Sequence, residues 1–196
     1  MNIKSVFFLS CTLMLTFALT GCSDTKQNKE AVNNKKNEQI NSKTTKPKPK
    51  KPIYPISLKS IKNGDINITK IQKGFSFSSA QNKPVLLAFF TSWCPPCKAE
   101  IPHLNTLQKT HKDKLEIIGV LLEDKDKKEI ESFMDKYEIS FKVTYGENNF
   151  KIANILGDIQ AIPFMILYDR DGKYANHYVG AVLEEMLDAD IKKVLK

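Results

Sequence analysis

Residues 85–98 read VLLAFFTSWCPPCK, and two features of this stretch govern how the rest of the chain is interpreted. Val85 to Phe90 is continuously apolar, which predicts a central strand covered on both faces. Cys94 and Cys97 follow at the start of a helix that we predict over residues 95–112. A C-x-x-C pair between a strand and a helix indicates a dithiol redox site. Half of a zinc site is the alternative, and it requires two further soft ligands from elsewhere in the chain.

The other cysteines and the histidines do not complete such a metal site. The chain has four cysteines, and Cys11 and Cys22 lie within or directly after an apolar N-terminal segment. The histidines are His103, His111 and His177. A c-type haem site needs a histidine directly after the second cysteine, where this chain has Lys98. We therefore predict no metal site, which leaves the redox interpretation of the pair.

The sequence of residues 1–21 predicts an export signal. Lys4 precedes an apolar core from Val6 to Leu19, which is too short for a typical membrane-spanning helix. The core ends in Leu19-Thr20-Gly21-Cys22, which resembles a bacterial lipoprotein processing box. That resemblance implies cleavage before Cys22 and acylation of its thiol. An ordinary secretory signal in which Cys22 is incidental is the alternative.

Residues 22–52 predict a disordered tether, because they are rich in lysine, asparagine, threonine and proline and contain almost nothing apolar. Such a segment would hold a domain away from the membrane that carries a lipidated Cys22. The formal net charge of the chain is +8, and nearly all of this excess lies in residues 1–52. Residues 53–196 are therefore almost neutral and long enough for one domain. This distribution removes the compositional argument for nucleic-acid binding.

Strands alternate with helices along residues 53–196. Short alternating stretches near 56–58 and 66–68 predict a hairpin or edge strands. Further strands are predicted over 85–91, 115–122, 141–145, 164–169 and 173–179, and helices over 95–112, 126–137, 149–156 and 184–195. The last two strands form a hairpin around Arg170-Asp171-Gly172. This order predicts an α/β layer fold with a central mixed sheet flanked by helices.

Three segments make the prediction more specific. They are residues 89–102 (FFTSWCPPCKAEIP), 161–167 (AIPFMIL) and 169–173 (DRDGK). Together they resemble the thioredoxin fold and, more narrowly, the membrane-tethered TlpA/ResA/CcmG type of thioredoxin-like protein. The resemblance covers about residues 55–196. It implies a thioredoxin-like domain that carries an N-terminal strand or hairpin extension.

The resemblance also implies roles for residues around the pair. Cys94 would be the exposed nucleophile, and Cys97 the buried resolving thiol. Pro163 would be a cis-proline lying against the dithiol, with a trans proline at a strand start as the alternative. The backbone of Ile162 would pair with an extended substrate segment. Trp93 would pack beside the site, either as a substrate-binding surface or as part of the core.

One position departs from the cytoplasmic thioredoxins. These carry a buried aspartate six residues before the first cysteine, where this chain has Ala88. The TlpA/ResA type has an acid three residues after the second cysteine, and here that residue is Glu100. Cys97 and Glu100 share one face of the predicted helix, so a partly buried Glu100 could exchange a proton with the resolving thiol. A solvated helix charge is the alternative.

Pro95 and Pro96 lie between the cysteines, where they would contact substrate, and they bear on the direction of electron flow. Strong oxidants of this fold often place a histidine there, which stabilises the thiolate. Neither proline is charged, and neither donates a backbone N–H. We therefore expect modest stabilisation of the Cys94 thiolate and a reducing potential.

The implied function is a lipid-anchored thiol–disulfide oxidoreductase on the periplasmic or extracytoplasmic face of the cell envelope. Cys94 would attack a partner disulfide and Cys97 would resolve the mixed disulfide, so that no metal or organic cofactor is needed. The expected partners are disulfide-containing envelope proteins, such as apocytochrome c, and a membrane thiol electron donor. We expect the protein to be a monomer.

Two other functions remain open at this point. Thr91 and Cys94 have the T-x-x-C spacing of peroxiredoxins, which suggests a thiol peroxidase, although Leu87 replaces the proline of that pattern. A non-catalytic lipoprotein binding module with unused thiols is the second. Glu123, Asp124 and Asp126 follow the predicted strand 115–122 near the expected site, where they could influence the choice of partner or simply be solvated.

Overall fold

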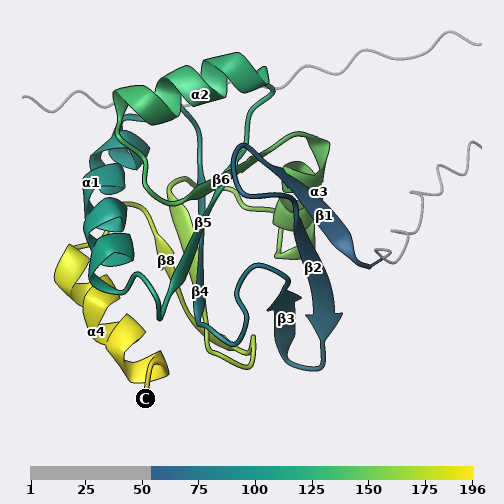
Figure 1. Cartoon of the computed structure of the whole chain (residues 1–196), viewed down its shortest axis with the longest axis vertical. Helices are drawn as coiled ribbons and strands as arrows, with labels where there is room; N and C mark the ends of the chain where they lie inside the picture. Colours follow the sequence, from purple (N-terminus) through teal and green to yellow (C-terminus); the bar gives the residue numbers. More distant parts are fainter. Residues whose placement is uncertain (1–53) are drawn as a thin grey trace, which may run out of the picture. The chain divides into compact units, whose positions relative to one another are not determined.

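The computed structural model describes residues 54–196, so the predicted signal, the lipidation site Cys22 and the tether lie outside the described residues. Within this range an eight-stranded mixed sheet has the order β3-β2-β1-β6-β5-β4-β7-β8 (Figure 1). The strands are β1 (Ile56–Ser60), β2 (Ile66–Ile71), β3 (Gly74–Phe77), β4 (Val85–Phe90), β5 (Glu116–Leu121), β6 (Lys142–Tyr145), β7 (Phe164–Tyr168) and β8 (Tyr174–Val179). The helices are α1 (Pro95–Thr110), α2 (Lys127–Lys136), α3 (Glu147–Ile155) and α4 (Glu184–Val194).

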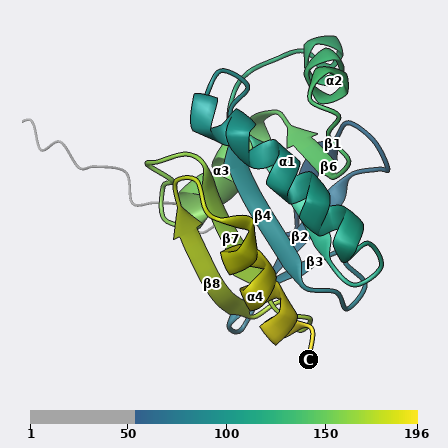
Figure 2. The same cartoon turned by 90° about the vertical axis from the view of Figure 1, so that its left-hand side faces the viewer.

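Strand β4 is an interior strand of the sheet, where it pairs in parallel with β5 and antiparallel with β7. All of its residues are buried, as the continuous apolar run predicts. Leu86 and Phe90 belong to the core on one face, and Leu87 and Phe89 to the core on the other. Helices α1, α2 and α4 cover the first face and α3 the second (Figures 1 and 2). The predicted α/β layer fold is therefore confirmed.

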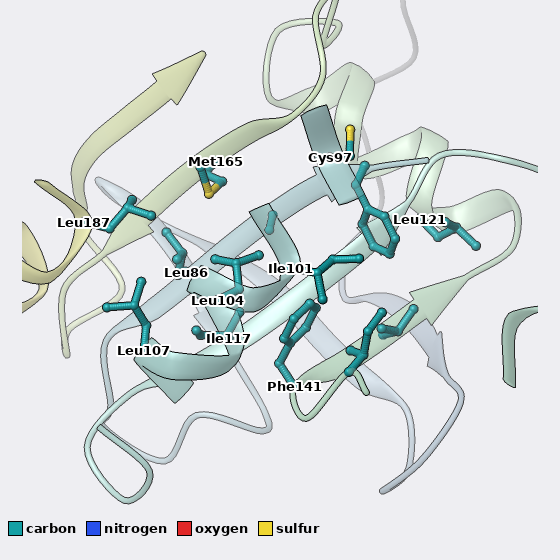
Figure 3. Packing of buried hydrophobic residues seen from close by; sticks show 14 of the residues in the cluster. Leu86, Cys97, Ile101, Leu104, Leu107, Ile117, Leu121, Phe141, Met165 and Leu187 are labelled. Carbon is teal, nitrogen blue, oxygen red and sulfur yellow. The ribbon is translucent and has the colours of Figure 1, made fainter. Parts of the chain in front are cut away.

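Helix α1 is held on the sheet by one apolar face. Ile101, Leu104 and Leu107, which recur at helical spacing, are each at most 4% exposed. Figure 3 shows these side chains directed at the sheet, among residues of β4, β5 and β7. This packing fixes the N-terminus of α1 beyond the carboxyl end of β4, and the C-x-x-C pair lies there.

The N-terminal extension is more than a hairpin. The predicted pair β1–β2 is confirmed, but a third strand, β3, pairs antiparallel with β2 and was not predicted. Strand β1 also pairs with β6, so the extension continues the main sheet. It then meets the β7–β8 turn, where the Phe75 N–H donates to the Gly172 carbonyl at 2.9 Å. A Cβ on Gly74 would lie 1.9 Å from that carbonyl oxygen, so this approach requires glycine.

The other predicted elements are present, with ends that differ by one or two residues. Such differences are expected, because helix and strand ends depend on hydrogen bonds that the sequence pattern does not encode. In the part of the chain from residue 54 onward, no helix has the length and apolar character needed to cross a membrane.

Candidate active site

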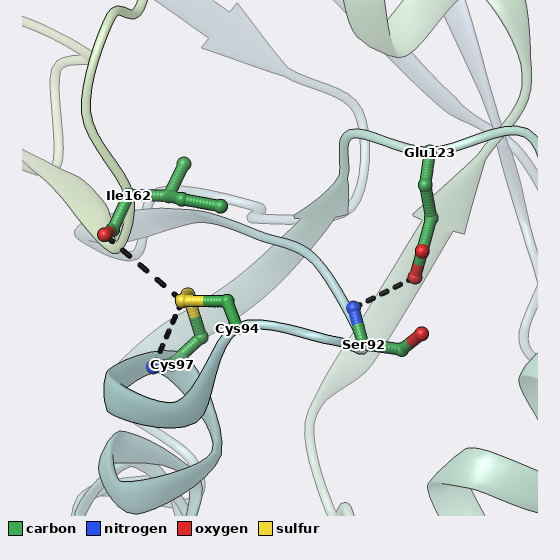
Figure 4. Close-up of a disulfide and its surroundings, with 5 residues drawn as sticks. All are labelled: Ser92, Cys94, Cys97, Glu123 and Ile162. Carbon is green, nitrogen blue, oxygen red and sulfur yellow. Dashed lines mark hydrogen bonds between the residues drawn. A yellow bond between two sulfur atoms is a disulfide. The ribbon is translucent and has the colours of Figure 1, made fainter.

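Cys94 and Cys97 are joined by a disulfide at the start of α1, and their Cα atoms are 5.3 Å apart (Figure 4). Cys94 is the N-cap of the helix, and Pro95 and Pro96 occupy its first two positions. Proline suits these positions because the N–H groups of the first turn have no partner within the helix. Cys97 is then the first helical residue with an N–H, which it donates to Cys94 Sγ at 3.2 Å. The sulfur thus replaces the oxygen of an ordinary N-cap side chain.

The prediction that Cys94 is exposed is wrong for this disulfide form. Cys94 is 3% exposed and Cys97 is 2% exposed. The bond to Cys97 directs the Cys94 sulfur toward the helix, and the carbonyl oxygen of Ile162 lies 4.0 Å from it (Figure 4). A disulfide sulfur has no proton to donate, so this contact becomes a hydrogen bond only in the thiol form.

The Ile162–Pro163 peptide bond is cis, in agreement with the resemblance. Pro163 is buried and lines the same small cavity as Cys97, whereas Ile162 is partly exposed. The N–H of Gly180 donates to the Pro163 carbonyl at 2.8 Å. This bond ties the loop to the end of β8 and leaves the Ile162 carbonyl facing the disulfide.

Glu100 is a buried carboxyl, so the alternative of a solvated helix charge is wrong. The residue is 2% exposed. Its Oε2 accepts a hydrogen bond from the Val182 N–H at 3.2 Å, and its Oε1 has no partner within the described part of the chain. Burial raises the pKa of Glu100, while the Val182 N–H and His103 act in the opposite direction.

A cavity of about 10 Å³ lies beside this carboxyl, and Ala88, Cys97, Glu100 and Pro163 are among the residues that line it. This is room for about one water molecule. The cavity also explains the departure from the cytoplasmic thioredoxins. The strand position at Ala88 and the helix position at Glu100 face the same space, so either can bring a carboxyl close to the second cysteine.

Trp93, Pro95 and Pro96 form an exposed rim around the disulfide. Trp93 is 67% exposed, which excludes the prediction that it belongs to the core. Both prolines are exposed as well. These three side chains are therefore available to a partner that approaches Cys94.

One contact of the active-site loop was not predicted from the sequence. Glu123, which follows β5, accepts a hydrogen bond from the Ser92 N–H at 2.7 Å through its Oε1 (Figure 4). For the acidic run of Glu123, Asp124 and Asp126, the sequence indicates only an influence on partner choice or simple solvation. Its position after the neighbouring parallel strand was the available signal, because the carboxyl ends of parallel strands meet at one edge.

Two of the three histidines pair with other groups. His111 Nε2 lies 2.7 Å from Asp188 Oδ1, and His177 Nδ1 lies 2.7 Å from the Tyr174 hydroxyl. Between residues 54 and 196, no group of three histidine, cysteine, aspartate or glutamate side chains is placed to hold a metal ion.

Comparisons with known proteins agree with this geometry. Residues 57–195 match the Redoxin family. The thioredoxin-like protein YneN of Bacillus subtilis is 31% identical over 121 residues, which cover 59% of this chain and 69% of YneN. The thiol-disulfide oxidoreductase ResA of Bacillus thuringiensis is 30% identical over 123 residues, 62% of this chain and 69% of ResA. A solved thioredoxin family protein of Chlorobium tepidum superposes with a TM-score of 0.60 at 22% identity, covering 75% of this chain and 99% of its own.

The fold, the disulfide at the helix start and these relatives define a thioredoxin-like thiol–disulfide oxidoreductase. The chain belongs to the Redoxin family, and its named relatives confirm the resemblance to the TlpA/ResA/CcmG type.

Proposed function

We propose that this protein is tethered to the extracytoplasmic face of a membrane and reduces disulfides in envelope proteins. The observation that carries this proposal is the Cys94–Cys97 disulfide at the start of α1, beside a cis-proline and a buried carboxyl. The lipoprotein-like sequence around Cys22 and the Lys/Pro-rich residues 22–52 support the tether. Apocytochrome c is one substrate in keeping with the family resemblance.

The reaction begins in the reduced protein with the Cys94 thiolate, which the N-terminus of α1 stabilises. Cys94 attacks one sulfur of a partner disulfide, and the other sulfur leaves as a thiolate and takes up a proton. The Cys97 thiolate then attacks Cys94 Sγ, which closes the Cys94–Cys97 disulfide and releases the second partner sulfur. Two electrons pass to the partner, and a membrane dithiol donor returns two electrons to the pair.

In this proposal, the substrate binds to the exposed rim and to the cis-proline loop. The Ile162 carbonyl lies 4.0 Å from Cys94 Sγ, so an extended segment that donates an N–H to this oxygen would bring its cysteine to Cys94. Pro163 holds this carbonyl in place. Trp93, Pro95 and Pro96 offer apolar surface on the side of the exposed rim.

Glu100 is suited to take the proton of Cys97 before the resolving step. Both residues line the same cavity, and Cys97 is 2% exposed, so bulk water has little access to its thiol. The raised pKa makes the Glu100 carboxylate a stronger base than an exposed glutamate. Space for about one water offers a bridge between the two groups.

Our inference about the direction of electron flow rests on the hydrogen-bond donors around the Cys94 sulfur. The two prolines supply no N–H, and the Lys98 N–H is bonded to the Cys94 carbonyl at 3.1 Å. In the first turn of α1 only Cys97 therefore donates to the Cys94 sulfur. A weakly stabilised thiolate favours the disulfide form and hence a reducing protein.

A trapping experiment tests the reaction. Cys97→Ser should accumulate mixed disulfides with envelope proteins that a reductant releases, because the resolving thiol is gone. Cys94→Ser is the matched control and should trap nothing. An empty Cys97→Ser trap would count against the proposal, and rapid hydrogen peroxide consumption by the purified protein would favour the peroxidase alternative.

Two further measurements test direction and location. Equilibration with glutathione should give a potential nearer the roughly −270 mV of thioredoxin than the roughly −120 mV of a strong oxidant. Cys22→Ser should move the protein from the membrane fraction to the soluble fraction, and membrane retention of this variant would argue against a lipid anchor.

A further inference from the structure

The parallel ladder between β4 and β5 ends irregularly beside the active site. Phe90 pairs with Leu121, and the Leu122 N–H donates to the Phe90 carbonyl at 2.9 Å. In a regular parallel ladder the next donor, the Ser92 N–H, would bond to the carbonyl of Leu122. It donates instead to Oε1 of Glu123 at 2.7 Å. A side chain has thus replaced the strand backbone as the acceptor, at the point where the chain turns away from the sheet.

This bond restrains the turn that carries Trp93. An N–H donated to a carboxylate is shorter and stronger than one donated to a neutral oxygen, and this one is partly buried. On the other side of Trp93, Cys94 is 3% exposed and caps α1. The 67% exposed indole therefore projects from a backbone that is held at both ends. Rigid, exposed aromatic side chains are typical anchors for a partner protein.

The other two acids of the run have different surroundings. Asp126 caps α2 by accepting the Glu129 N–H at 2.8 Å. Asp124 is exposed. The acidic run is therefore not a single surface feature, and Glu123 is the member that contacts the active-site loop.

We propose that Glu123 is a positioning residue that fixes the Ser92–Trp93 turn and so holds the Trp93 indole where a partner polypeptide reaches the disulfide. The partner is a polypeptide with an apolar side chain near its reacting cysteine. The proposal rests on disulfide reduction in proteins as the function of the site. It adds a determinant of partner recognition that makes no direct contact with the reacting sulfurs.

The chain offers a direct probe of this turn, because Trp93 is its only tryptophan. Time-resolved fluorescence anisotropy of Trp93 therefore reports the local motion of the turn without any need for catalysis. Glu123→Ala should increase the fast, local part of the anisotropy decay, since the Ser92 N–H loses its acceptor. Glu123→Gln keeps a neutral acceptor and should fall between Glu123→Ala and the unmodified protein. Glu131→Ala, at a half-exposed glutamate on α2, is the matched control.

Kinetics with two substrates test recognition. Glu123→Ala should lower kcat/KM for a protein disulfide by about tenfold, the change expected when one hydrogen bond to a charged group is lost. The decrease should be larger than the decrease for a small disulfide reagent, which does not need the Trp93 surface. Circular dichroism of each variant verifies folding. If Glu123→Ala is unfolded, the same measurements on Glu123→Gln test the proposal.

The outcomes separate this proposal from the function on which it rests. Unchanged Trp93 anisotropy in a folded Glu123→Ala variant would overturn the positioning role, whatever the activity. A mobile Trp93 with equal losses for both substrates would overturn the role in partner recognition. If the unmodified protein reduces no protein disulfide, the proposed function fails and recognition fails with it, while anisotropy still decides whether Glu123 holds the turn.

Discussion

Substitution of Glu100 by glutamine tests the most unusual ionisable group of the site. Glutamine has nearly the same shape and can keep the hydrogen bond from the Val182 N–H, but it carries no charge. Glu100 is 2% exposed, and its Oε1 has no hydrogen-bond partner among the described residues. The variant therefore imitates the protonated carboxyl and removes the ionised form that burial disfavours.

The expected effect depends on pH. Burial raises the folded-state pKa of Glu100 above the ordinary value of 4.5, so the folded protein holds this proton more tightly than the unfolded chain. The stability that this provides is fully present below about pH 4.5 and is lost as the pH rises through the folded-state pKa. At higher pH, Glu100→Gln should be more stable than the unmodified protein by on the order of 1–2 kcal/mol, because it keeps no ionised group in a buried site where one carboxylate oxygen lacks a partner. At about pH 4 the two proteins should be alike.

The assay is guanidinium unfolding of the disulfide form at several pH values, analysed as the free energy of unfolding at a common m-value. Glu131→Gln on α2 is the control. The Glu131 side chain is half-exposed and pairs with Lys127 at 3.7 Å, so this variant should follow the unmodified protein to within about 0.5 kcal/mol at every pH. Parallel curves for Glu100→Gln and the unmodified protein across the whole range would refute the reasoning. That result would mean that the carboxyl ionises as easily inside the protein as in water.

Three other substitutions test the packing and the charge pairs of the fold by equilibrium unfolding. Leu107→Ala, at a position that is 1% exposed between α1 and the sheet, should cost about 2–5 kcal/mol, and a loss near zero would contradict the described core. Gly74→Ala should cost about 1–3 kcal/mol, because its Cβ would lie 1.9 Å from a backbone oxygen of the β7–β8 turn. Lys192 and His111 lower the pKa of Asp188, so its stabilisation is present above pH 3.8 and disappears as the pH falls through the folded-state pKa. Asp188→Asn should therefore lose up to about 1 kcal/mol at neutral pH and almost nothing in acid.

Local patterns in the chain were enough to predict most of the fold. The continuous apolar run of β4 and the helical spacing of Ile101, Leu104 and Leu107 depend on neighbours in sequence. The strand predicted over 85–91 and the helix predicted over 95–112 are both confirmed. Strand β3 was missed because its four residues, Gly74 to Phe77, are too short to show a clear period. Its contact with the β7–β8 turn depends on the path of the whole sheet.

The chemical identity of the site also came from adjacent residues. Two cysteines at the start of a helix, with prolines between them, indicate a redox pair wherever the helix lies, so the sequence alone identifies Cys94 and Cys97. The surroundings of the site residues, in contrast, could not be predicted from the sequence. The Val182 N–H that holds Glu100 is 82 residues away in the chain, and Glu123 is 31 residues from Ser92. Only the tertiary structure decides that Glu100 is buried, that Trp93 is exposed and that a carboxylate anchors the active-site turn, because burial and hydrogen bonding arise between segments that meet only when the sheet is assembled.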